Sequence, residues 1–214
     1  MTFWQYVEEV PDAEPDVVRR CEMTARLHAA LRGYDGTDLG FWTPFNAYIP
    51  EGLAMLGERP DLLGSTDHER AQREWGLLSP LLASRAAVED AFPGVEVQTI
   101  HGDAPFHNMI STADGDRWSD FELVTQGPAE SDLTMAGSDG IAAYNEAAAR
   151  LGLRLLDERL LRVTEAAGML GVVACLAMAP ELPLLVDGVK TVLDRWRDGP
   201  SIADVLPGTR GGRR

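Results

Sequence analysis

The stretch that decides the fold is His101-Gly102-Asp103-Ala104-Pro105-Phe106-His107-Asn108, a turn-rich segment between two short apolar runs. The run before it, Val95 to Ile100, and the run after it, Met109 to Thr112, are both typical of short β-strands. Asp103 and Asn108 stand five residues apart within the stretch. A carboxylate that can accept a proton beside an oxygen ligand for a hard cation indicates phosphoryl-transfer chemistry.

A second acidic candidate, Asp120, follows Asn108 by twelve residues. The turn Ala113-Asp114-Gly115-Asp116 between Met109–Thr112 and the run Arg117–Glu122 predicts a β-hairpin, because Asp-Gly is a strong hairpin signal. Pairing of these two runs brings Asn108 and Asp120 to the same end of the hairpin. The amide and carboxylate oxygens there suit Mg²⁺.

The rest of the chain is predicted to be mostly helical. A strand is expected over Thr2 to Val10, and residues 33–63, rich in Gly, Pro and Asp, are expected to form a loop. A capping box from Thr66 to Glu69, Asp139 and Asp157 are expected to start three of the helices. The helices are expected at Pro15–Leu31, Thr66–Arg85, Ser84–Ala91, Gly140–Leu151, from Asp157 onward, and Val186–Arg197.

Composition limits the class of protein. The 214 residues suffice to bury a sizeable core, and the net charge of −15 disfavours binding to nucleic acid or to an anionic membrane surface. The same charge favours a cationic small molecule. Cys21 and Cys175 lie on apolar helix patterns and are expected to be reduced thiols of a cytoplasmic protein. No secretory signal opens the chain, and the apolar segment Gly168 to Val186 is interrupted by Pro180 and Pro183, so it is expected to be a buried helix and a turn rather than a membrane span.

Three ordered motifs resemble the aminoglycoside phosphotransferase family, whose fold is protein-kinase-like. They are His101-Gly102-Asp103 with Asn108, then Ser119-Asp120-Phe121-Glu122, then Gly127-Pro128-Ala129-Glu130-Ser131-Asp132-Leu133. Residues 25–28, Ala-Arg-Leu-His, also look like the family's Leu-His helix, although His28 on an apolar face is expected to be a packed core histidine. The resemblance covers nearly the whole chain from Thr2 onward. It implies an α+β, mostly α fold: a kinase-like C-terminal lobe with a short β-hairpin carrying the catalytic loop and helices around it.

The resemblance also implies a role for each matching residue. Asp103 looks like the catalytic base for the substrate hydroxyl, and Asn108 and Asp120 look like the ligands of Mg²⁺. His101, Glu122 and Asp132 look like supporting residues, with Asp132 as a structural carboxylate that ties the loop to the helices. The backbone of Tyr6 and Val7 would lie in the hinge strand that holds adenine.

The resemblance also implies a domain organisation, cofactors and partners. Residues 1–13 are expected to be a remnant of the hinge strand, 14–209 the kinase-like C-terminal lobe, and 210–214 a disordered basic tail. The expected cofactors are ATP (or GTP) and Mg²⁺, and the expected partner is a small molecule with a hydroxyl group, with neither nucleic acid nor membrane. The face left by a missing N-terminal lobe is expected to be apolar and to favour a dimer.

Two other functions remain open from the sequence. In this fold a preceding β-lobe supplies a glycine-rich loop and a lysine that bind the phosphates, whereas no glycine-rich loop precedes Pro11 and the only lysine is Lys190. A truncated phosphotransferase and a non-catalytic kinase-like module that binds a small molecule or a partner chain both fit this pattern. A metallohydrolase that uses His101, Asp103 and His107 is a weaker alternative, because it leaves the other motifs without a purpose.

Overall fold

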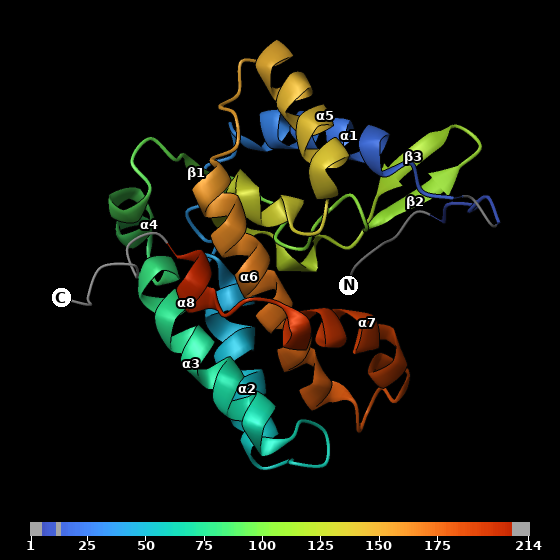
Figure 1. The fold of residues 1–214 in the computed structure, drawn as a ribbon. Coiled ribbons are helices and arrows are strands. Elements are labelled where there is room, and N and C mark those ends of the chain that lie inside the picture. The colour runs from blue at the N-terminus through green and yellow to red at the C-terminus, as the bar shows by residue number, and fades with distance from the viewer. Residues whose placement is uncertain (1–5, 12–13, 207–214) are drawn as a thin grey trace.

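The computed structural model describes residues 6–11 and 14–206. This part of the chain is mostly helical and carries two small antiparallel sheets (Figure 1). The α-helices are α1 (Val17–Leu31), α2 (Ile49–Gly57), α3 (Ser65–Leu82), α4 (Arg85–Ala91), α5 (Gly137–Arg150), α6 (Glu158–Cys175), α7 (Leu184–Asp198) and α8 (Ile202–Val205). The strands are β1 (Val97–Ile100), β2 (Met109–Thr112), β3 (Gly115–Trp118) and β4 (Thr125–Pro128).

The two sheets lie on either side of the His101–Asn108 loop in sequence. β1 pairs with β4, with Ile100 opposite Thr125, and β2 pairs with β3, with Met109 opposite Trp118. The loop therefore leaves β1 of one sheet and enters β2 of the other, so the expected short hairpin directly follows the loop. The β2–β3 hairpin itself is confirmed, although β3 begins at Gly115 and ends at Trp118, where a strand over Arg117–Glu122 was expected. Phe121–Leu123 form a short 3₁₀ turn (η2) instead.

Two hydrophobic clusters hold the helices together. The first joins α2, α3, α4, α6 and α7, with Leu53, Leu78 and Leu170 fully buried. The second joins α1 and α5 to the His101–Asn108 loop and includes the buried side chains of Ala25, Phe106 and Tyr144. In Figure 1 α6 runs through the middle of the molecule, with α1 and α5 across the top and α2 and α3 at the lower left. The His101–Asn108 loop is thus anchored in the second cluster through Ala104 and Phe106.

Side-chain caps start several helices because the first backbone N–H groups of a helix have no partner within it. Asp157 accepts hydrogen bonds from the N–H groups of Arg159 and Leu160 at the start of α6, as expected. The other two expected caps are wrong: α3 begins one residue before Thr66 without a side-chain cap, and Asp139 lies inside the first turn of α5. The local sequence allows a helix to start at either cap, but the turns that precede α3 and α5 make these helices start earlier, at Ser65 and Gly137.

The segment 33–63 is not a plain loop as expected. It contains a π-helical turn (η1, Pro44–Tyr48) that continues directly into α2. Ile49 and Leu53 are fully buried against the first cluster. Tertiary packing therefore overrides the loop composition of this segment, as it commonly overrides local propensity.

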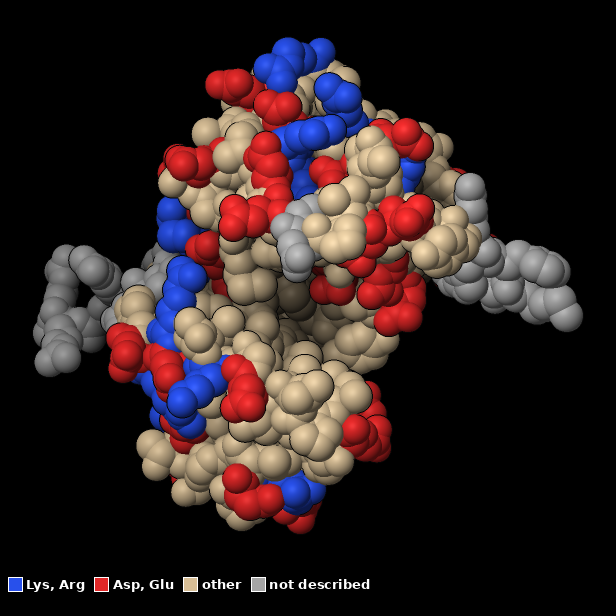
Figure 2. Space-filling view, turned by 90° about the vertical axis from the view of Figure 1, so that its right-hand side faces the viewer, with Lys and Arg blue, Asp and Glu red and all other residues tan. Residues whose placement is uncertain are grey.

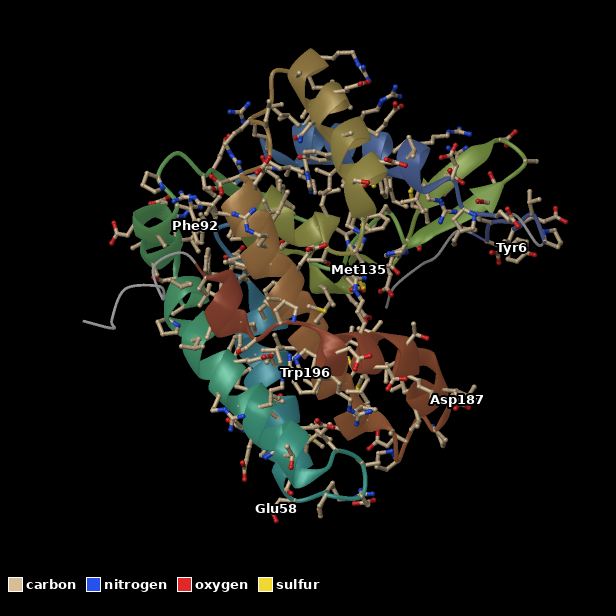
Figure 3. All side chains as sticks on the ribbon, viewed as in Figure 1. Tyr6, Glu58, Phe92, Met135, Asp187 and Trp196 are labelled. Atoms are coloured by element: carbon tan, nitrogen blue, oxygen red, sulfur yellow. The ribbon has the colours of Figure 1, made fainter. Side chains whose placement is uncertain are left out.

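The described residues of the expected hinge strand do not form one. Residues 6–10 have no regular secondary structure, and Tyr6 is 87 % exposed at the edge of the molecule (Figure 3). The N–H of Val10 donates one hydrogen bond, of 2.8 Å, to the carbonyl of Ser111. Thr2 to Gln5 and the expected basic tail, 210–214, lie outside the described residues.

The apolar segment near the C-terminus is a helix followed by turns, as expected. The helical stretch Glu158–Met178 has the length and hydropathy to cross a membrane. It begins ten residues before Gly168, where the apolar segment considered in the sequence begins. However, 56 % of its most apolar window is buried inside the protein, as in the core helix of a soluble protein. Helices α7 and α3 are joined by a buried hydrogen bond. The indole N–H of Trp196 on α7 donates to a carboxylate oxygen of Glu74 on α3 at 2.7 Å, and Figure 3 labels Trp196.

Candidate active site

The His101–Asn108 loop turns sharply at Gly102, which explains why glycine stands there. Gly102 has a φ of +92°, a conformation that L side chains rarely adopt, and an added Cβ would collide with the carbonyl oxygen of Leu123. Ala104, two residues on, has a φ of +36°, and Asp120 has a φ of +57°. Left-handed conformations at residues other than glycine are costly and cluster at functional sites, which marks this loop and the Asp120 segment as candidates.

Beneath the loop lies Asp132, a fully buried carboxylate. One of its oxygens, Oδ1, accepts the N–H of Gly102 at 2.8 Å, and the other, Oδ2, accepts the N–H of His101 at 2.9 Å. Oδ2 also accepts a hydrogen bond from Nε2 of His28 at 2.9 Å. These bonds fix the backbone immediately before Asp103, which is the geometry expected of a structural carboxylate.

His28 connects this carboxylate to α5. Its side chain is fully buried, as expected of a core histidine, and its Nδ1 lies 2.8 Å from the hydroxyl of Tyr144. Because a carboxylate only accepts hydrogen bonds, Nε2 must carry a hydrogen and donate it to Asp132. In the neutral ring, Nδ1 then accepts a hydrogen bond from the Tyr144 hydroxyl. α1 and α5 therefore hold the loop through a continuous buried chain of hydrogen bonds.

His101 links the loop to the Asp120 segment. Its Nε2 donates to the carbonyl of Ser119 at 2.9 Å, next to Asp120. Ser119 in turn donates to the carbonyl of Asn108 twice, from its N–H at 3.0 Å and from its hydroxyl at 2.8 Å. The structure therefore brings Asn108 beside the Asp120 segment at one end of the β2–β3 hairpin, as the hairpin pattern predicts.

Asp103 is exposed and is contacted by the side chain of Asn108. The amide Nδ2 donates to Oδ2 of Asp103 at 3.0 Å and to its backbone carbonyl at 2.6 Å. Both partners are acceptors, so the NH₂ group must face them and the Asn108 oxygen must face away. Asp103 Oδ1 makes no hydrogen bond within the described part of the chain and is left for a ligand.

The donor set fits a magnesium ion that keeps other oxygens from water or phosphate. Asn108 offers an amide oxygen, and the exposed carboxylate of Asp120 has neither a hydrogen bond nor an ion pair among the described residues. Mg²⁺ is commonly held by one or two carboxylates together with phosphates and waters. No cluster of three or more His, Cys, Asp or Glu side chains exists in residues 6–11 and 14–206 to hold a metal by itself.

A cleft opens directly beside Asp103. Its volume is about 560 Å³, and it is lined by Asp103, Glu122 and residues of α2, α6 and the turn that follows α6. Figure 2 shows a hollow in the middle of one face, with acidic side chains gathered along part of its rim.

Of the two cysteines, Cys175 lines this cleft, and burial together with the charge of Asp103 raises the pKa of its thiol. Cys21 is fully buried, and both thiols are free, as expected.

The geometry does not assemble the alternative metal site of His101, Asp103 and His107. The Nε2 of His101 is engaged by the Ser119 carbonyl, while its buried Nδ1 has no partner within the described part of the chain. The ring of His107 lies 4.1 Å from that of Phe106, and burial, with the nearby charge of Arg20, lowers the pKa of this histidine. Burial and a neighbouring cation disfavour the charged form of a base, which accounts for that direction.

Several residues of the site were not predicted from the sequence. Tyr144 extends the buried chain below the loop, and Glu130, also fully buried, binds Arg154 through two hydrogen bonds of 2.7 and 2.8 Å. Glu51 and Tyr48 line the cleft from a segment that was expected to be a loop. Periodicity gives no signal for such partners, because each joins segments that are far apart in the chain.

Comparisons with known proteins identify the family of the chain. A family model described as the phosphotransferase enzyme family (APH) matches residues 2–166, a range that includes the His101–Asn108 loop and both later motifs. Comparison with curated proteins gives no match. Among solved structures, the crystal structure of aminoglycoside phosphotransferase from Alicyclobacillus acidocaldarius subsp. acidocaldarius DSM 446 is similar. It has a TM-score of 0.58 and 16 % identity, over 94 % of this chain and 69 % of that chain.

At this identity the structural likeness shows the fold alone, and a mostly helical chain with small antiparallel sheets is consistent with that fold. The family model covers well over half of the chain, including the motifs on which the resemblance was recognised. The chain belongs to the phosphotransferase enzyme family, the aminoglycoside phosphotransferase type of kinase-like protein.

Proposed function

We propose that this chain transfers the terminal phosphoryl group of ATP (or GTP) to a hydroxyl of a small molecule, in a Mg²⁺-dependent reaction. The observation that carries the proposal is the exposed carboxylate of Asp103 at the edge of a cleft, oriented by the amide of Asn108. A carboxylate that accepts the hydroxyl proton, next to oxygens that can hold a cation, is the arrangement that phosphoryl transfer requires.

Each residue has a part in the reaction. Asn108 Nδ2 holds one oxygen of Asp103, which leaves the other oxygen to orient the acceptor hydroxyl and to take its proton. The Asn108 oxygen and the Asp120 carboxylate would hold the cation, which when bound neutralises charge on the phosphate oxygens. Asp132 and His101 position the backbone of the two segments that carry these groups.

The proposal assigns to these residues the base and metal half of a kinase site, in a C-terminal lobe. The only lysine of the sequence, Lys190, is exposed on α7 and does not match the lysine that binds phosphates in this fold. Tyr6 and Val7 stay candidates for the backbone that holds adenine. A Glu122 role in binding the acceptor fits its position at the cleft.

Calorimetric titration of the full chain with ATP, with and without Mg²⁺, tests the metal site. We expect binding that depends on Mg²⁺ and that Asp120→Ala weakens about tenfold or more, because the cation loses a charged ligand. Asp114→Ala, which removes an exposed carboxylate at the tip of the same hairpin, is the matched control and should leave binding unchanged. Binding that ignores both Mg²⁺ and Asp120→Ala would contradict the site.

The alternative, a non-catalytic kinase-like module, differs in one outcome. Such a module binds ligands in the cleft but moves no phosphate from labelled ATP to any hydroxyl compound, with or without Mg²⁺. The free oxygen of Asp103 at the cleft favours transfer over this alternative. Mass spectrometry of candidate acceptors after incubation with ATP and Mg²⁺ decides between them.

A further inference from the structure

The chemistry of the cleft beside Asp103 indicates which acceptors fit. Given the phosphotransferase function proposed above, we propose that the acceptor is an amphiphilic amino alcohol: a hydroxyl compound with an apolar body and a single positive charge. Polar polycations and anions are disfavoured. The walls, the rim and the charges of the cleft each contribute to this inference.

The walls of the cleft are small and apolar. Gly171, Ala174 and Ala177 form one side, on α6 and the turn η4 (Leu176–Met178). Gly52 of α2 approaches this side so closely that an added Cβ would lie 2.7 Å from the carbonyl oxygen of Ala174. The backbones of the two helices therefore close the bottom of the cleft, and their lack of bulk creates its volume. Few wall side chains offer the hydrogen bonds that a sugar-like polyol would need.

The rim carries large apolar side chains that the fold leaves in water. Tyr48 is 52 % exposed, Met55 is 51 % exposed and Met178 is 45 % exposed, and all three line the cleft. Such side chains lose unfavourable contact with water when an apolar ligand covers them. Methionine also adapts its shape to different ligands, and tyrosine offers a flat face. An apolar acceptor body of moderate size suits this rim.

The charges of the cleft are all negative. Asp103, Glu122 and Glu51 line it, and no Arg, Lys or His side chain does so within the described part of the chain. Glu51 belongs to the first turn of α2, and Glu122 to η2, so two separate elements contribute negative charge to the cleft in addition to Asp103. An amine is attracted and a carboxylate or phosphate on the acceptor is repelled, with modest energies because the groups are exposed.

Gly171 provides a direct test of the wall. An added Cβ there meets no atom within 4 Å, and Gly171 lines the cleft, so a substitution at this position begins in open space at the wall. Gly76 on α3 is the matched control, because it is also helical, has the same open space and lies outside the cleft. Both substitutions replace a helical glycine and should not lower the free energy of unfolding.

The experiment measures binding of three probes to the full chain by saturation-transfer NMR, without nucleotide. Aminooctanol carries an amine, a hydroxyl and an apolar chain; hydroxyoctanoate replaces the amine with a carboxylate; kanamycin is a polar polycation. We expect aminooctanol to bind at least tenfold more tightly than either of the others. Gly171→Leu should weaken its binding at least tenfold, and Gly76→Leu should not change it.

Two further measurements keep the proposal open to refutation if Gly171→Leu fails to fold. Glu51→Gln should weaken aminooctanol binding by about two- to fivefold and should strengthen that of hydroxyoctanoate, as expected for exposed charge pairs. Alkylation of Cys175 by N-ethylmaleimide should slow when aminooctanol is bound, because this thiol lines the cleft. Tighter binding of kanamycin or hydroxyoctanoate, or no binding of aminooctanol at millimolar concentration, would overturn the inference.

These outcomes are distinct from failure of the phosphotransferase function. Probe binding is measured without ATP, whereas the function is tested by Mg²⁺-dependent binding of ATP and by Asp120→Ala. If aminooctanol binds and Gly171→Leu prevents it while ATP does not bind, the specificity of the cleft stands and the proposed transfer does not. If ATP binds as expected but kanamycin binds more tightly than aminooctanol, the transfer stands and the inferred acceptor class is wrong.

Discussion

The two sides of the His101–Asn108 loop differ in how completely their polar groups are paired. On the inner side, Asp132 is fully buried and accepts three hydrogen bonds, and Glu130 nearby accepts three more, from Arg154 and from the N–H of Asp157. On the outer side, Asp103 and Asp120 are exposed, and Asp120 has no side-chain partner among the described residues. Buried charges must be paired to be tolerated, whereas exposed ones remain available to a ligand.

This difference separates stability from chemistry within one short segment. The inner carboxylates fix the backbone, and the fixed backbone presents the outer carboxylates at defined positions. Substitutions on the inner side should therefore change the free energy of unfolding, and substitutions on the outer side should change activity. The following substitutions test that division in order of decreasing effect.

Asp132→Ala should have the largest effect on stability. It leaves the N–H groups of His101 and Gly102 and the ring N–H of His28 buried without an acceptor, which costs on the order of 5 kcal/mol. Urea denaturation followed by circular dichroism measures the change. Asp139→Ala, at an exposed aspartate of α5, is the control and should stay within about 0.5 kcal/mol of the parent.

Arg154→Met should be the next largest. Glu130 is completely buried, so removal of its bidentate partner leaves a carboxylate that retains only the N–H of Asp157, at a cost of about 3–5 kcal/mol. The exposed pair Arg59–Asp61 has similar geometry, and Arg59→Met should leave the free energy of unfolding nearly unchanged, because water already solvates both charges. Equal losses of stability for the two substitutions would contradict the proposed importance of burial.

Asp103→Asn should show the opposite pattern. Transfer of phosphate should fall about 100-fold or more, because asparagine cannot accept the hydroxyl proton, while the free energy of unfolding should change by less than about 1 kcal/mol. Assay of phosphate transfer and urea denaturation on the same preparation measure both quantities. Unchanged transfer would remove Asp103 from the role of base, and a large loss of stability would remove the contrast between the two sides.

Tyr144→Phe should have a smaller effect that sharpens the comparison. It removes one hydroxyl from His28 and leaves the contacts with Asp132 in place, so about 1 kcal/mol of stability should be lost. If the buried chain also positions Asp103, kcat should fall modestly while the affinity for ATP stays constant. Loss of stability equal to that of Asp132→Ala would show that the two side chains act as one unit.

His107 should give the smallest effect, visible in the pH dependence of stability. Its folded-state pKa is lowered by burial and by Arg20, so below the unfolded-state pKa of about 6.5 the unfolded chain binds more protons. This histidine therefore destabilises the folded protein increasingly as pH falls from about 7 to 5. His107→Gln should flatten that decrease in urea denaturation, and a steeper decrease would contradict the direction of the shift.

Much of the fold and of the site can be predicted from local patterns. The limits of β2, the cap of α6 by Asp157 and the hairpin that brings Asn108 beside the Asp120 segment all depend on residues close together in sequence. The helix starts at Thr66 and Asp139 were predicted wrongly, because several local patterns allow a start and the preceding turn selects one. Of the strand expected over Thr2 to Val10, the described residues 6–10 are not paired as a strand, and a strand needs a partner with which to pair.

The sequence by itself determined which side chains are the candidates for the proposed chemistry, because Asp103, Asn108 and Asp120 stand close together in sequence, with a hairpin between Asn108 and Asp120. The tertiary structure alone decided what supports and surrounds them. Three of these features are contacts between segments that are distant in sequence. They are the pairing of β1 with β4, the hydrogen bonds of Asp132 to the loop, and the contribution of α2 to the cleft wall. Such contacts depend on packing and burial, which local composition does not encode.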